Sequence, residues 1–160
     1  MSDRPLPKQR QLRYQALEFG MFCNFGPTTF TDREWGEGND DPRTFNPTAL
    51  DPDQWARAAV EAGMRYLVFT AKHHDGFCLW RTDTTDYSVA ASPYPGDVVE
   101  LVAQACRDHG LMLGLYCSPW DRHEPCYEDP PAYDRHFAAQ WTELLTRYGE
   151  VGYVWLDGAG

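Results

Sequence analysis

The chain alternates short apolar runs with patterns of helical period, and this alternation limits the folds open to it. The apolar runs cover residues 19–25, 64–71, 111–117 and 151–156. The helical patterns lie between them at 51–62, 97–109 and 132–148, and each stops at a glycine. Near-continuous apolar strands separated by helices are typical of a parallel sheet covered by helices. The sequence therefore predicts an α/β fold with about four strands and three helices.

Polar side chains help to choose between a doubly wound sheet and a (β/α)₈ TIM-type barrel. Asn24, residues 72–75, residues 118–121 and Asp157 all follow the ends of predicted strands. Barrel enzymes build their sites at that end of the sheet. No GxGxxG or phosphate-binding loop follows the first strand, which argues against a nucleotide-binding doubly wound sheet. The pattern favours a barrel.

The number of strands sets the expected domain organisation. A (β/α)₈ barrel takes about 250 residues and eight units, so we interpret these residues as its N-terminal half. We expect a polar segment at 1–15 and a partial barrel at 16–160, truncated after the fourth strand. Such a half barrel leaves the edges of its first and fourth strands unpaired, which predicts self-association through those edges.

Charge and composition exclude several classes of partner. The chain has 24 acidic and 14 basic side chains, a formal net charge of −10, which disfavours nucleic acid and anionic membranes. No apolar run approaches the roughly 20 residues that span a bilayer. The polar start offers no secretory signal, so cytoplasm is the default location. The five cysteines form no CxxC pair, which favours reduced thiols over disulfides.

The end of the fourth strand carries a carboxylate beside an indole. Asp157 lies two residues after Trp155, and the two are expected to face the same side of the strand. An aromatic ring next to an acid suits a sugar, because C–H groups of the sugar stack on the ring and the acid takes its hydroxyls. The alternative is a turn cap, which is the role of most Asp-Gly pairs.

Two adjacent histidines, His73 and His74, follow the second strand. We expect their rings to point to different sides and to hydrogen-bond ligand hydroxyls as neutral imidazoles. Zinc is the rival interpretation, but a zinc amidohydrolase-like barrel would prefer an HxH pair, and the chain has none. A zinc site of Cys117, His123 and Cys126 is a lesser alternative, since close cysteine pairs are absent. We predict no metal and no organic cofactor.

Two further loops offer polar and aromatic side chains to the same end of the sheet. The loop after the first strand carries the adjacent pair Glu34 and Trp35, which could clamp a hydroxylated ring, although loop tips are often polar for solubility alone. The third strand and the segment after it add four candidates to one face, which are Tyr116, Trp120, Asp121 and His123.

The chain carries four motifs in order, which are FGMFCNFGPTTFTDREWGEG, TAKHHDGFCLW, GLYCSPWDRHE and VWLDG. Together they resemble glycoside hydrolase family 29 α-L-fucosidases of the branch that acts on α-1,3/1,4-linked fucose. The resemblance covers most of residues 16–160. It implies retaining hydrolysis of a terminal fucose on a glycan, in a (β/α)₈ barrel followed by a β-sandwich. It also implies that Asp157 is the nucleophile. The residues that it assigns to the fucose pocket are His73, His74, Glu34, Trp35, Trp155 and Tyr116, and we add Trp120 as a candidate.

The chain departs from the family pattern at two places. Asn24 stands where the family usually has a histidine, and asparagine can still hydrogen-bond a hydroxyl but cannot titrate. A retaining mechanism also needs a second carboxyl about 5–5.5 Å from the nucleophile. The family's acid/base lies downstream of the region present here, and none of Glu124, Glu128, Glu143 and Glu150 matches its motif.

Two other functions remain open at this point. A fucose-binding module, or an inactive fragment without turnover, would keep the hydroxyl contacts and lack the acid. A metal-dependent barrel hydrolase would carry zinc. The resemblance favours a glycosidase in which Asp157 attacks the anomeric carbon while Glu34 and the imidazoles orient the ring.

Overall fold

The structure is a computed structural model that describes residues 5–157 of the 160. Its four strands form one parallel sheet in the order β1-β2-β3-β4. They are β1 (Gly20–Cys23), β2 (Tyr66–Lys72), β3 (Met112–Cys117) and β4 (Tyr153–Trp155). Sequential parallel order is the arrangement of consecutive strands in a (β/α)₈ barrel. The predicted α/β class and the four predicted strands are confirmed, each shorter than or shifted slightly from its apolar run.

Three helices connect the strands, as the sequence predicts. They are α2 (Pro52–Glu61), α3 (Val98–His109) and α4 (Pro130–Arg147). The carboxylates of Asp51 and Asp97 cap α2 and α3 by accepting backbone N–H groups. Gly110 ends α3 in the left-handed region, with φ of 67°, where a side chain would be strained. The capping aspartates, the helical spacing of apolar residues and the terminal glycines therefore agree on where these helices begin and end.

One hydrophobic core lies between the helices and the outer face of the sheet. Alternate residues of β2, Leu67, Phe69 and Ala71, belong to it together with side chains from all three helices. The other face of the sheet is concave. Its curvature brings Phe22 of β1 and Trp155 of β4 into contact across two intervening strands, with ring centroids 4.9 Å apart. The curved inner face and the loops beside it, which carry these aromatic rings, are referred to as the hollow.

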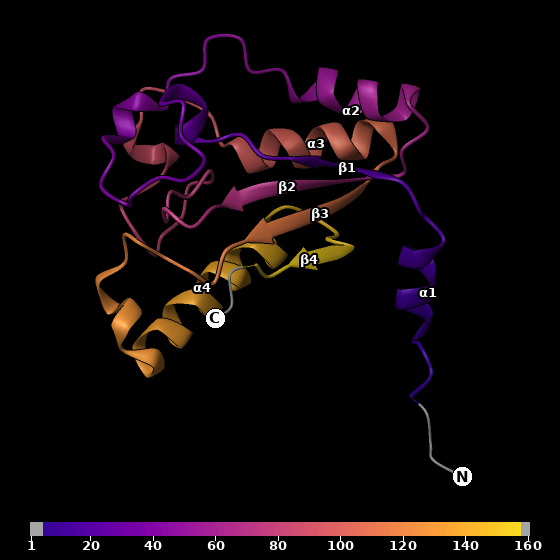
Figure 1. Cartoon of the computed structure of the whole chain (residues 1–160). Helices are drawn as coiled ribbons and strands as arrows, with labels where there is room; N and C mark the ends of the chain where they lie inside the picture. The colour runs from indigo at the N-terminus through magenta and orange to yellow at the C-terminus, as the bar shows by residue number, and fades with distance from the viewer. Residues whose placement is uncertain (1–4, 158–160) are drawn as a thin grey trace.

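The strands all point to the same side, where the long loops gather (Figure 1). Four short 3₁₀ helices lie in these loops, η1 (Pro27–Phe30), η2 (Pro42–Thr44), η3 (Val89–Ala91) and η4 (Pro125–Glu128). The pairing of β2 with β3 shifts register between Thr70 and Lys72. Such a bulge re-aims the residues that follow it. It sends Lys72 behind the sheet and His73 to its inner face.

The first helix, α1 (Gln9–Gln15), lies in the segment expected to be only polar. It stands at the opposite end of the sheet from the loops (Figure 1). Tyr14 stacks on Tyr153 with ring centroids 4.6 Å apart, and this contact holds a helix that buries no residue of its own. Residues 1–4 and 158–160, which the predicted domain ranges include, lie outside the described residues. Within residues 5–157 no helix is long and apolar enough to cross a bilayer.

Candidate active site

Asp157 meets Tyr116 at the carboxyl ends of β3 and β4. The Tyr116 hydroxyl donates to Asp157 Oδ2 at 3.1 Å. Tyr116 is 2% exposed, so burial, followed by the hydrogen bond and charge of Asp157, raises the pKa of its hydroxyl. The tyrosine therefore stays a donor and orients a carboxylate that is itself open to solvent. Trp155 lies against the same tyrosine, with ring centroids 6.3 Å apart.

His73 and His74 lie together beside Tyr116. Their ring centroids are 4.2 Å apart, so the prediction that they point to different sides is wrong. That prediction rests on the two-residue period of a strand, but β2 ends at Lys72, so both histidines lie in the turn after it. His73 stacks on Tyr116 at 5.7 Å, and His74 Nδ1 lies 2.7 Å from Ser118 Oγ. Two imidazoles thus line one hollow with the carboxylate.

Trp35 and Trp120 form an aromatic wall next to His74. The His74 ring lies 5.7 Å from the Trp35 centroid and 5.1 Å from the Trp120 centroid. Arg122 joins the two loops that carry these indoles, because its guanidinium lies 4.8 Å from the Trp120 ring and donates to the Gly36 carbonyl. The wall is therefore built from segments far apart in the sequence, and neither Arg122 nor Ser118 was among the predicted site residues.

The remaining predicted residues differ in how close they come to this cluster. Asn24 lines a small cavity together with Thr70 and His73. Glu34 is exposed and has no hydrogen bond or ion pair with the other described residues. The structure thus gathers seven of the predicted side chains around one hollow, which are His73, His74, Tyr116, Trp120, Trp155, Trp35 and Asp157, with Asn24 at its margin.

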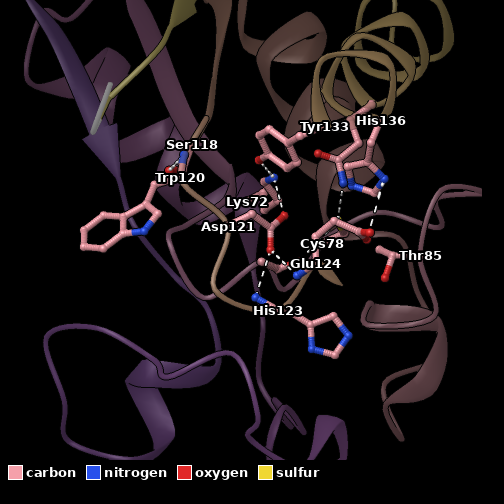
Figure 2. A network of polar contacts seen from close by, with 12 residues as sticks. Lys72, Cys78, Thr85, Ser118, Trp120, Asp121, His123, Glu124, Tyr133 and His136 are labelled. Atoms are coloured by element: carbon pink, nitrogen blue, oxygen red, sulfur yellow. Dashed lines mark hydrogen bonds and ion pairs between the residues drawn. The ribbon is translucent and has the colours of Figure 1, made fainter. Parts of the chain in front are cut away.

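Asp121 and His123 do not share the face of Trp120, and the prediction that they do is wrong. Asp121 turns back to form an ion pair of 2.7 Å with the fully buried Lys72 (Figure 2). His123 stacks on Tyr87, with ring centroids 4.0 Å apart, and its Nδ1 contacts the Gly38 carbonyl. The loop after β3 reverses at this point, which residue spacing alone does not reveal.

The buried ion pair joins the loop to the back of the sheet. Lys72 Nζ lies between Asp121 and the Tyr133 hydroxyl of α4, and Asp121 Oδ1 accepts the backbone N–H groups of His123 and Glu124 (Figure 2). Burial works against the ammonium, but the acidic groups Cys117 and Asp121 beside it raise the pKa of Lys72. Lys72 is therefore charged, and its charge is fully desolvated.

Close backbone approaches fix the turn after the histidines. Asp75 is buried and accepts the backbone N–H of Phe77, and burial raises the pKa of its carboxyl to about 6. A Cβ at Gly36 would lie 2.7 Å from Asp75, and Gly76 has a φ of 84°. Only glycine fits at both positions. These contacts hold the Trp35 loop against the turn that follows His74.

The described residues show no cluster suited to a metal ion. Within residues 5–157 no group of three or more His, Cys, Asp or Glu side chains is arranged to hold one. The five cysteines are all free, and Cys117 is buried in the core, apart from His123 on its loop. The donor set of the hollow is instead one carboxylate, two imidazoles and indole or phenol rings, which suits a neutral ligand rich in hydroxyls.

We expect His73 to titrate near pH 4. Burial, followed by the neighbouring His74, lowers its pKa from 6.5 to about 4, although Asp157 opposes the shift. Because the folded pKa lies below the unfolded value, the unfolded chain binds protons first. The free energy of unfolding therefore falls as pH drops from about 6.5 to about 4, and below that this group adds no further change. NMR titration of the ring, assigned with His73→Gln, measures the pKa; a value at or above 6.5 would contradict the placement.

Comparisons with known proteins agree on one family. A sequence profile described as Alpha-L-fucosidase matches residues 39–160. The chain is similar to alpha-L-fucosidase 1 of Arabidopsis thaliana, with 52% identity over 158 residues that cover 97% of this chain and 31% of that protein. The chain thus spans about a third of the length of the curated plant relatives that it matches.

Two solved structures are similar in both sequence and fold. A glycoside hydrolase 29 family member from an unknown rumen bacterium gives a TM-score of 0.94 at 52% identity, over 98% of this chain and 28% of that one. A mutant GH29 fucosidase of Ruminococcus gnavus, in complex with fucose, gives a TM-score of 0.87 at 38% identity, over 96% and 36%.

Proposed function

This chain belongs to the alpha-L-fucosidase family, and from that premise we propose that the natural polypeptide carrying these residues releases terminal α-L-fucose from fucosylated glycans. The proposed reaction is retaining hydrolysis. Asp157 attacks the anomeric carbon and forms a covalent fucosyl ester, which water then hydrolyses. The observation that carries the proposal is the contact of Tyr116 with Asp157, which aims an open carboxylate into a hollow lined by imidazoles and aromatic rings.

We further propose that this hollow holds the fucose ring. His73 and His74 contact its hydroxyls as neutral imidazoles, since burial lowers the pKa of both. Trp35 and Trp155 offer ring faces to its C–H groups. At the margin of the hollow, Asn24 takes the place of the histidine that the family usually has there. Glu34 reaches a hydroxyl of the ligand only if its exposed loop closes on the ligand. No step needs a metal or an organic cofactor.

The second carboxyl is proposed to come from outside these residues. Glu143 is buried and already accepts from Trp80 Nε1 at 2.7 Å and from Thr82 Oγ1 at 2.6 Å. Glu124 accepts the N–H of Cys126 and lies beside His136. Both carboxylates therefore serve the packing of α4 and its loop, so neither is free to protonate a leaving group next to Asp157.

The remaining units of the barrel are the proposed source of that acid. In the proposal these residues are the N-terminal half of the catalytic domain, and β1 and β4 pair with further strands. Without such strands, the exposed Phe22 and Trp155 and the open edges favour self-association. The preference for α-1,3/1,4-linked fucose is proposed from the motifs alone.

An aryl α-L-fucoside with a good leaving group tests the function. Such a group departs without protonation, so the substrate reports the nucleophile separately from the acid. We expect release of the aryl group from the fucoside and none from the matched aryl β-D-galactoside. Binding of fucose with no release would favour a fucose-binding module, and comparing α-1,2- with α-1,3- and α-1,4-linked oligosaccharides would test the linkage.

A further inference from the structure

The hydroxyl of Ser118 lies directly behind His74, and the proposed reaction gives it no role. Ser118 follows the end of β3 and is fully buried. Its Oγ lies 2.7 Å from His74 Nδ1 and 3.0 Å from the backbone nitrogen of Trp120. Ser118 therefore contacts two residues of the hollow at once, from the side that faces the protein.

The hydrogens available on the Trp120 nitrogen, the Ser118 hydroxyl and the His74 ring determine which group donates each hydrogen bond. The Trp120 N–H can only donate, so Ser118 Oγ accepts there. The hydroxyl has its own hydrogen to place, and Nδ1 of a neutral imidazole is an acceptor within reach. The 2.7 Å separation fits a hydrogen bond in either direction, so the direction follows from where each hydrogen can go. Donation from Ser118 to Nδ1 leaves the ring proton of His74 on Nε2.

The opposite arrangement places the hydrogens less well. Ser118 Oγ would accept from both Trp120 and His74, and its own hydrogen would need another acceptor inside the protein. The Tyr116 hydroxyl, with which Ser118 also interacts, is the candidate. That hydroxyl donates to Asp157, and among the hydrogen bonds of residues 5–157 none joins it to Ser118 with good geometry. A buried hydroxyl hydrogen without an acceptor is costly.

We propose that Ser118 is a positioning residue that holds His74 in the Nε2–H tautomer, so that the hollow presents an imidazole N–H donor to a hydroxyl oxygen of the ligand. The identity of that ligand rests on the proposed function, whereas the tautomer does not. A hydroxyl that accepts from His74 keeps its own hydrogen free to donate to an acceptor elsewhere in the hollow. Ser118 thereby sets the direction of the hydrogen bonds around the ligand.

Nitrogen NMR of the histidine rings tests the tautomer directly. In the wild-type protein we expect the His74 proton on Nε2 and Nδ1 as a hydrogen-bond acceptor. Ser118→Ala removes the donor, so the ring should become a mixture of tautomers, and Ser118→Thr, which keeps the hydroxyl, should restore the wild-type signals. Ser92→Ala is the matched control, because Ser92 Oγ donates to the Val89 carbonyl in a different loop. A wild-type His74 with its proton on Nδ1 overturns the proposal.

Binding of free fucose supplies the second readout. We expect Ser118→Ala to bind fucose about five- to tenfold more weakly, the loss of one oriented hydrogen bond, and Ser118→Thr to stay within about twofold of wild type. Equal affinity of Ser118→Ala and wild type overturns the positioning role. If the wild-type protein has the Nε2–H tautomer and binds no fucose, the assignment of Ser118 to the tautomer stands and the proposed function fails.

Discussion

We expect Asp157→Asn, made in the natural polypeptide, to reduce the proposed fucoside hydrolysis roughly 10³- to 10⁶-fold in kcat, the range seen when a covalent nucleophile is removed. The amide keeps the size of the side chain and a hydrogen-bond acceptor for Tyr116, so the site keeps its shape while the proposed nucleophile is lost. Hydrolysis of the aryl α-L-fucoside measures the effect. Because such a substrate needs no protonation of its leaving group, the loss reports the nucleophile alone.

The matched control is Asp108→Asn on α3, whose carboxylate accepts from Gln104 on the helix surface. We expect that variant to hydrolyse the fucoside as wild type does. A fluorinated fucoside inactivator should label Asp157, and peptide mass mapping locates the label. Attachment of the label to any other residue, or full activity of Asp157→Asn, would remove Asp157 from the proposed mechanism.

Replacing Lys72 by Met should destabilise the fold by about 3–5 kcal/mol, because it leaves the Asp121 carboxylate buried without a partner of opposite charge. Both side chains are almost completely buried, at 0% and 2% exposure, so neither solvent nor salt compensates for the missing partner. The variant also removes the contacts of the ammonium with Tyr133 and with the Phe137 ring. Urea unfolding measures the change in the free energy of unfolding.

A double variant separates the effect of the unpaired buried charge from the effect of lost packing contacts. Lys72→Met with Asp121→Asn has no buried charge, and the Asn oxygen still accepts the N–H groups of His123 and Glu124. We expect it to recover at least half of the lost stability. Arg57→Met, which breaks the exposed Arg57–Asp53 pair, is the control and should cost about 0.5 kcal/mol or less. A double variant no more stable than Lys72→Met would contradict the charge argument.

The strands and connecting helices could be predicted because local signals and packing agree there. The run at 111–117 becomes β3, and the pattern at 97–109 becomes α3 with Asp97 as its cap. Helix α1 could not be predicted, because its sequence has no apolar stripe. It is held by the stacking of Tyr14 on Tyr153, a contact between opposite ends of the chain.

The candidate site was predictable as a set of residues but not as an arrangement. Polar residues after a strand identify the edge of the sheet at which the site lies, yet they do not show which face of the sheet each side chain occupies. The bulge between Thr70 and Lys72 moves Lys72 behind the sheet, and the reversal of the β3 loop takes Asp121 with it. Arg122 gave no signal, and Ser118 gave none beyond its place after a strand, because their roles depend on Trp35 and His74, which come from other segments.

The bulge in β2 places neighbouring residues on opposite faces of the sheet, and this constrains how the protein can be engineered. Lys72 anchors the outer layer while His73 faces the ligand hollow, so a shift of the backbone that accommodates a new side chain at one also rotates the other. If the proposed function holds, selection for heat tolerance and selection for altered sugar preference therefore act on the same short stretch of chain. Libraries that vary α2, α3 and the outer loops, and leave residues 70–76 untouched, keep the two goals independent.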